Sequence, residues 1–448
     1  MGSRSLFFKL FILAGVTLLL CFVLMRIGWL VDERQQRQAE AIANVEQSQA
    51  GDQVLVGPLV LRSCSEEWDV PTNDVNGQKT FVDRREFVLT AIPSNLSVSG
   101  ALNQEPRYRG LFKVNGYMGK LQLKAQWPSL LALQGKAMHA GGRVQCDTPQ
   151  VMLATSDARG LRGAEVMLGG EHLNVKPGTL HPEYPRGLHA PLAQQALDAP
   201  LQLVVMLDLA GTQRFALVPA AGATQLNLRS NWPHPSFGGR FLPTTREITD
   251  QGFSAQWQVS ELSSTAAADV QQNKAIPGVG GKVQGDVDTL EFAMIDPVNP
   301  YVMSDRAIKY GLMFIGLTFV CVGLVELLSG RRVHPVQYLF VGLALSVFFL
   351  LLLSLSEHLS FGISYLLAAT AAVLLLGYYG AAMLGSWQRG AGFGTGIAAL
   401  YGALYVLLSL EQASLVIGAL LLFAVLATIM VLTRRLDWYA LGSRVTTQ

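Results

Sequence analysis

The chain has 448 residues, of which half are hydrophobic and only 15% are charged, against about 25% charged residues in an ordinary soluble domain. The mean hydropathy is +0.32. The formal net charge is +2, and no stretch clusters Lys and Arg into a basic surface, so we exclude a nucleic-acid-binding protein.

Six apolar runs are long enough to cross the hydrocarbon core of a bilayer, which takes about 20 residues in a helix. They cover residues 7–30, 310–328, 337–355, 361–384, 393–410 and 414–432. Lipid offers no partner to a free backbone N–H or C=O, so these runs are predicted to be helices. We therefore expect a cytoplasmic tip and anchor helix over residues 1–31, a bundle of five transmembrane helices over residues 304–433, and a cytoplasmic tail over residues 434–448.

The N-terminal run has a second interpretation, a cleaved secretory signal peptide, because Arg4 and Lys9 precede its apolar core. The run is long for that role. The nearest small-x-small triplets, around residues 39–43, lie over a dozen residues beyond Met25. We favour an uncleaved signal anchor.

The direction in which the helices cross the membrane follows from the positions of Lys and Arg. Short loops that contain these residues remain on the cytoplasmic side. One side collects Arg4, Lys9, Arg331, Arg332, Arg389, Arg434, Arg435 and Arg444. The opposite short loops, residues 356–360 and 411–413, contain neither residue type and carry Glu357 and Glu411. We expect a multi-pass membrane protein, embedded in a lipid bilayer, with both termini cytoplasmic and residues 32–309 exported.

Residues 32–50 are rich in Gln, Glu, Arg and Ala, which favours a polar helical linker that continues the anchor. Beyond Gly51, short apolar or alternating runs are separated by Gly, Pro and Asn, a pattern typical of strands and turns. The runs cover residues 54–61, 85–92, 96–102, 110–118, 120–127, 151–155, 201–209, 213–219, 224–230, 253–259 and 290–294. Residues 51–300 are thus predicted to form a large antiparallel, sandwich-like β domain, either single or divided into two subdomains near residues 176–200. The fold class is an α+β membrane protein.

Four cysteines are present. Cys21 and Cys321 lie inside apolar runs and are expected to behave as small hydrophobic residues. Cys64 and Cys146 fall in the exported part, where a disulfide is chemically allowed. The sequence leaves open whether they are bridged or remain two independent thiols.

Sequence motifs of catalysis are missing: there is no G-x-S-x-G, H-E-x-x-H, Walker A loop, G-x-G-x-x-G after a strand or C-x-x-C. The exported histidines have no second ligand at a recognised metal-binding spacing. We therefore expect no catalytic residue, no metal and no cofactor, and a protein that is not an enzyme. An envelope hydrolase is the less favoured alternative.

Six residues near predicted helix ends are candidates for a role at the membrane interface: Glu357, His358, Arg306, Lys309, Glu326 and His334. Glu357 and His358 place a carboxylate beside an imidazole; the alternative is that both are solvated while Ser360 caps the next helix. Arg306 and Lys309 are suited to headgroup anchoring. Glu326 lies about one turn from the cytoplasmic end of its helix, within reach of Arg331, Arg332 or His334. Glycines at 377, 380, 385, 392, 394 and 396 favour close helix packing over a pore.

Several segments resemble the CreD family of inner-membrane proteins. They are residues 304–369, from SDRAIKYGLMFIG to SFGISYLLAA, residues 231–257 (NWPHPSFGGRFLPTTREITDQGFSAQW), residues 108–117 (YRGLFKVNGY) and the Gly57-Pro58 strand. The resemblance implies a cell-envelope integrity protein of a bacterial inner (plasma) membrane, with the exported residues 32–309 in the periplasm. It also implies a link to a two-component regulon, colicin tolerance and the response to β-lactams, and it brings no catalytic residue. At Gly238-Gly239-Arg240 the sequence lacks the acidic residue that the family pattern leads us to expect.

Two functions remain open. The first is a non-enzymatic envelope-integrity protein whose β domain contacts an envelope protein or a peptidoglycan-related ligand. The second is a transporter or lipid-handling protein that uses the C-terminal helices. Because of their position at the membrane surface, replacing both Glu357 and His358 by alanine is expected to disturb the envelope phenotype without preventing insertion; unchanged sensitivity to detergent and colicin would contradict this.

Overall fold

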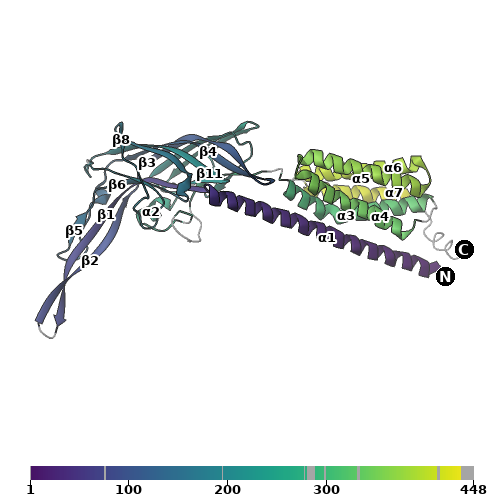
Figure 1. Ribbon diagram of the computed structural model, residues 1–448, viewed down its shortest axis with the longest axis horizontal. Helices are drawn as coiled ribbons and strands as arrows, with labels where there is room; N and C mark the ends of the chain where they lie inside the picture. The colour runs from purple at the N-terminus through teal and green to yellow at the C-terminus, as the bar shows by residue number, and fades with distance from the viewer. Residues whose placement is uncertain are drawn as a thin grey trace. The chain divides into compact units, whose positions relative to one another are not determined.

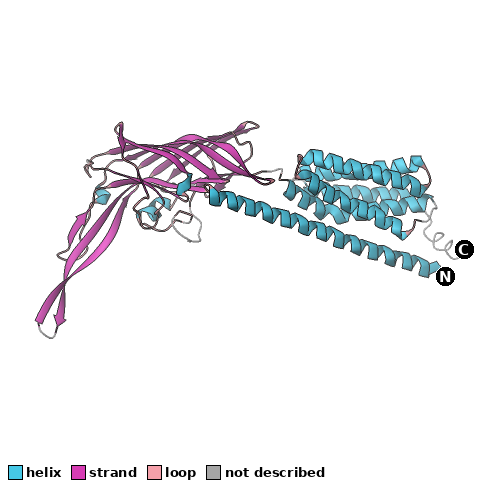
Figure 2. Cartoon of the chain, in the orientation of Figure 1, coloured by secondary structure: helices cyan, strands magenta, loops and turns pink. Residues whose placement is uncertain are grey.

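The computed structural model describes residues 2–74, 77–193, 195–276, 278–279, 288–296, 299–329, 333–410 and 414–434. The chain divides into two compact units, one made of Met1–Ala39 with Val298–Gln448 and one made of Glu40–Pro297. The first unit is helical and the second consists mainly of strands (Figures 1 and 2). Each has its own hydrophobic core.

All six predicted helices are present. They are α1 (Gly2–Ser48), α3 (Pro300–Ser329), α4 (Pro335–Ser356), α5 (Phe361–Leu384), α6 (Trp387–Ser409) and α7 (Ser414–Thr433). Among the described residues, α1 and α3 to α6 contain stretches long and apolar enough to span a membrane, and α7 contains a shorter one, Val416–Thr428. The predicted fold class is confirmed, and α1 continues through the polar linker as one helix.

Glycines allow close contacts between neighbouring helices. A Cβ on Gly342 of α4 would lie 2.1 Å from a Leu20 methyl group of α1, and one on Gly390 of α6 would lie 2.4 Å from the Ala381 Cα of α5. Gly377 and Gly394 also face each other across α5 and α6. The predicted small-residue packing is therefore realised there, whereas Gly392 and Gly396 have open space beside them.

The strands of the second unit form two sheets. The nine-stranded sheet contains β1 (Gln53–Asp74), β2 (Gly77–Ala91), β5 (Arg143–Cys146), β6 (Gln150–Thr155), β9 (Lys176–Pro177), β10 (Gly187–Pro191), β12 (Arg214–Leu217), β14 (Pro235–Gly239) and β17 (Leu290–Met294). The eight-stranded sheet contains β3 (Asn95–Arg109), β4 (Phe112–Trp127), β7 (Leu161–Leu168), β8 (Glu171–Leu173), β11 (Leu201–Thr212), β13 (Ala223–Ser230), β15 (Thr245–Thr249) and β16 (Gly252–Ser260).

The main core of this unit lies between the sheets. Tyr117 and Trp257 come from the eight-stranded sheet, and Phe215 and Phe292 from the nine-stranded sheet. Alternate residues of β13 are buried, as expected for a strand with one face on a core. A smaller cluster covers the other face of the nine-stranded sheet and includes Val270 of the short helix α2 (Ala266–Gln271).

Three features of the β unit differ from the sequence prediction. The runs 110–118 and 120–127 were predicted as two strands, but residues 112–127 form the single strand β4, and residues 110–111 form the turn before it. Gly119 does not break it; the glycine allows close approach to β3, since a Cβ there would lie 1.8 Å from the Ala101 oxygen. The pairing is mostly antiparallel, but β1 with β12 and β13 with β3 are parallel.

The third difference concerns short strands. β5, β7 to β10, β14 and β15 have no counterpart among the predicted runs. Residues 176–200, where the sequence left a possible subdomain break, contribute β9 and β10 to the nine-stranded sheet.

Candidate functional sites

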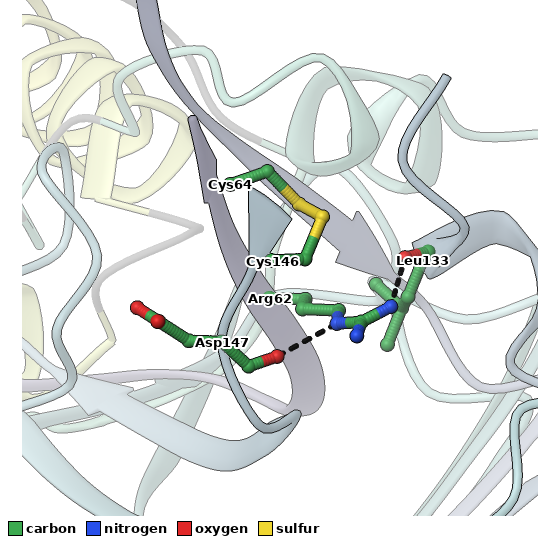
Figure 3. The surroundings of a disulfide bond; sticks show 5 residues. All are labelled: Arg62, Cys64, Leu133, Cys146 and Asp147. Carbon is green, nitrogen blue, oxygen red and sulfur yellow. Dashed lines mark hydrogen bonds between the residues drawn. A yellow bond between two sulfur atoms is a disulfide. The ribbon is translucent and has the colours of Figure 1, made fainter. Parts of the chain in front are cut away.

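A disulfide and an arginine fasten the segment 134–146 to β1. Cys64 and Cys146 are bridged, with an S–S distance of 2.04 Å, in directly paired strands. Arg62 donates one hydrogen bond to the Leu133 oxygen (3.3 Å) and another to the Asp147 oxygen (2.7 Å), so it holds the chain on both sides of the segment (Figure 3). We call residues 134–146 the brace segment.

A buried carboxylate holds the middle of the brace segment. The Glu66 side chain is fully buried, and its Oε1 accepts hydrogen bonds from the backbone N–H groups of Met138 (2.7 Å) and His139 (2.8 Å). These bonds, that of His139 first, hold the pKa of Glu66 below its usual value against the opposing effect of burial. The His139 ring stacks on Trp68 at 3.7 Å. The brace therefore stiffens the base of the long β1–β2 hairpin, which projects from the sheet in Figure 1.

The C-terminal end of α1 is fastened to the β unit. Arg159 donates to the backbone oxygens of Glu46 (2.8 Å) and Gln47, and Asp157 accepts from the Gly51 N–H (3.2 Å). A cation at the last carbonyls of a helix satisfies groups that have no partner within the helix. These hydrogen bonds fix the segment 46–51, which connects α1 to β1.

The structure gives Glu357 a specific partner. Its carboxylate lies 3.3 Å from Nε of Arg34 on α1, and the Glu357 side chain is 10% exposed. Four residues beyond Arg34, Gln38 accepts a hydrogen bond from the Asn299 side chain (3.1 Å), which links α1 to the start of α3. Glu357 is therefore not simply solvated. His358 is exposed, and Ser360 stands at the N-cap of α5 without a side-chain cap bond.

We expect the Glu357→Ala substitution to lower the stability of the helical unit by about 1–2 kcal/mol, because Arg34 would lose its carboxylate; Arg34 is partly exposed, which reduces the effect. His358→Ala is the control and should leave stability unchanged. Thermal unfolding of the purified full chain measures both. Recovery in the charge-swapped double variant Arg34→Glu/Glu357→Arg would support direct pairing, whereas equal losses in Glu357→Ala and His358→Ala would contradict it.

The other predicted interface residues are spread over α3 and α4. Glu326 accepts a hydrogen bond from the Tyr338 hydroxyl (3.0 Å). His334 caps α4 by accepting from the Val336 N–H (3.3 Å). Lys309 pairs with Asp305 (2.7 Å), and Arg306 lies on the same helix. Arg331 and Arg332, the expected partners of Glu326, lie outside the described residues, as do Glu411 and the tail beyond residue 434.

One candidate binding site in the β unit was not predicted from the sequence. It is an open trough of about 890 Å³ on the outer face of the eight-stranded sheet, over the neighbouring strands β3, β13 and β16 and beside the start of β15. Nine polar residues line it together with Gly100, Ala101, Leu228, Ala255 and Trp257; the polar ones are Ser99, Gln225, Asn227, Arg229, Thr244, Thr245, Ser254, Gln256 and Gln258. We call this site the polar trough.

The trough has long amide side chains on β13 and β16 and small residues on β3. Asn227 is directly paired with Gln256 on one side and with Ser99 on the other. The side chains of Asn227 and Gln256 are exposed and make no hydrogen bond within the described part of the chain. They are therefore available to a ligand. The alternation of Gln225, Asn227 and Arg229 with buried residues was visible in the sequence, but it is equally typical of a solvated strand face.

A second groove, of about 510 Å³, lies between α5 and α6. Three tyrosines line it, Tyr365, Tyr401 and Tyr405, together with small and aliphatic residues. The Tyr365 hydroxyl donates to the Tyr401 backbone oxygen (2.6 Å), which links the two helices. This groove is mostly apolar and suits a hydrocarbon chain better than an ion.

Together, these features define the class: an integral membrane protein with apolar helices and one large, disulfide-bridged β unit. The model of the family described as "Inner membrane protein CreD" matches residues 5–439. The inner membrane protein CreD of Escherichia coli (strain K12) is 34% identical over 446 residues, which cover 98% of this chain and 95% of that protein. The chain belongs to the CreD family of inner membrane proteins.

Solved structures show only a weak likeness. The M1 zinc metallopeptidase from Deinococcus radiodurans aligns with a TM-score of 0.19 and 10% identity over 37% of this chain and 38% of its own. A mutant of that enzyme bound to a Tyr-Ser-Ala substrate gives a TM-score of 0.20 with the same identity and coverage. Scores this low carry no argument about fold or function.

Proposed function

We propose that the chain is an envelope-integrity protein that acts by binding rather than by catalysis, with its β unit in the periplasm and both termini in the cytoplasm. The polar trough carries this proposal, because it offers exposed amide and hydroxyl groups for recognition of an envelope component. The residues that line it include no carboxylate and no imidazole in the described part of the chain. The described lining also includes no lysine, tyrosine or cysteine, and these side chains are the ones that usually serve in general acid–base catalysis.

The location is supported by two observations. The cationic residues of the short loops and tails fall on one side of the helices, the pattern of cytoplasmic loops. The Cys64–Cys146 disulfide belongs to the β unit, and disulfides persist in oxidising compartments such as the periplasm.

The test is complementation of a strain that lacks the gene. Asn227→Ala/Gln256→Ala removes a directly paired couple from the trough, whereas Gln126→Ala/Gln202→Ala removes a directly paired amide couple from the same sheet face outside it. We expect only the trough variant to lose resistance to deoxycholate and to a β-lactam, with both proteins at equal levels in the membrane. Full complementation by the trough variant would overturn the proposal.

The groove between α5 and α6 favours a second candidate function, lipid handling by the C-terminal helices. Ala369→Trp and Ala398→Trp would fill this groove from its two sides. If lipid handling is the function, these variants should fail to complement while the trough variant succeeds. If binding at the trough is the function, the two results should be reversed.

A further inference from the structure

Most of the hydrogen-bonding side chains of the polar trough can both donate and accept. Carboxamides can donate and accept at the same time, and hydroxyl groups do likewise. Gln225, Asn227, Gln256 and Gln258 supply the carboxamides, and Arg229 is the single charged residue of the lining. A ligand matched to this surface is largely uncharged and has many hydroxyl or amide groups. Nucleic acids and other polyphosphates, which require several cationic contacts, do not fit this description.

An extended peptide fits less well. Peptides that bind to sheets usually add a strand and use the free backbone groups of an edge. The three strands of the trough floor have no such edge, since β3 pairs with β4 and β13, β13 with β3 and β16, and β16 with β13 and β15. The edge strand β15 reaches the trough only with Thr245 at its start, so recognition across the floor depends on side chains.

The small residues of the lining leave room for a chain of rings. Ser99 and Ala101 on β3 project little, while the longer side chains of β13 and β16 stand beside them. The single aromatic residue of the lining, Trp257, is 2% exposed and offers no face for stacking. Binding here therefore depends on hydrogen bonds to substituents of the rings, and an acetamido group, with one N–H and one C=O, complements a carboxamide side chain.

We propose that the polar trough binds a glycan that carries N-acetylamino groups. This inference rests on the proposed function and names the class of its ligand. Asn227 and Gln256 form the centre of the site, and Arg229, which is paired with Ser254, provides a position for an acidic substituent of the glycan.

Titration of the purified full chain with N,N′,N″,N‴-tetraacetylchitotetraose tests the proposal by calorimetry, in a detergent without a sugar headgroup, since such headgroups would compete. We expect saturable binding by the unmodified chain and by Gln126→Ala/Gln202→Ala. Asn227→Ala/Gln256→Ala should bind about 10- to 100-fold more weakly, the loss expected for two or more hydrogen bonds. Maltotetraose, which has hydroxyl but no acetamido groups, should bind at least about 10-fold more weakly to the unmodified chain.

Three results would overturn the proposal: no saturable binding at millimolar chitotetraose, equal binding by the trough variant, or equal binding of maltotetraose. The substituted side chains are exposed, so equal thermal unfolding of the variants and the unmodified chain should exclude misfolding. A trough variant that fails to complement in cells, combined with an unmodified chain that does not bind chitotetraose, would refute the glycan and leave the proposed function standing.

Discussion

Replacing Cys64 and Cys146 by serine is expected to lower the free energy of unfolding of the β unit by about 2–4 kcal/mol. The two residues are 82 positions apart, so the bridge removes much conformational freedom from the unfolded chain. The loss should also free the brace segment, which depends on the bridge, on Arg62 and on Glu66 for its attachment to β1. Urea unfolding of the full chain, followed by tryptophan fluorescence, measures the change.

The matched control is Cys21→Ser/Cys321→Ser, because both of these cysteines are free thiols in the helical unit. It should leave the unfolding of the β unit unchanged. Equal stability of the Cys64→Ser/Cys146→Ser variant and the unmodified chain would show that the brace is held without the bridge.

Phe292→Ala is expected to cost about 3–5 kcal/mol, the range for loss of a large aromatic side chain from a core. Phe292 is fully buried, and its ring lies 6.2 Å from Tyr117, 6.2 Å from Phe215 and 5.2 Å from Phe253, measured between centroids. Phe215 belongs to the same sheet, whereas Tyr117 and Phe253 belong to the other. The substitution therefore leaves a cavity where the two sheets meet.

Phe81→Ala makes the same chemical change at a position that is 52% exposed on the β1–β2 hairpin. It should alter stability by less than about 0.5 kcal/mol. Urea unfolding of both variants gives the comparison. Similar effects of the two substitutions would contradict the placement of Phe292 between the sheets.

The sequence was most informative where one physical constraint dominates. Lipid leaves no alternative to a helix, so all six helices could be predicted from hydropathy alone, and the polar linker could be recognised as a continuation of α1. Strongly alternating strands such as β13 were equally clear. Short strands were missed because β5 and β10 depend on pairing with β1 and β6 rather than on a pattern of their own.

The sites were harder to predict because they depend on residues distant in sequence. Glu357 was recognised as a candidate, but its partner Arg34 lies in another helix and no local pattern connects the two. Cys64 and Cys146 were a possible pair, and only the register of β1 with β5 places them opposite each other. The polar trough lies across β3 and β13, which are neighbours in a parallel pairing. The sequence predicted only antiparallel strands and so could not place these two side by side.

The location of the β unit is the central claim, and accessibility of single cysteines tests it most directly. In a chain with Cys21 and Cys321 replaced by alanine, Leu262→Cys places a thiol at a position that is 94% exposed in the β unit, and Trp387→Cys places one at a 72% exposed position beside Arg389. In spheroplasts, a membrane-impermeant maleimide should label Leu262→Cys at once and Trp387→Cys only after lysis. Labelling of Trp387→Cys in intact spheroplasts, with Leu262→Cys protected until lysis, would contradict the account.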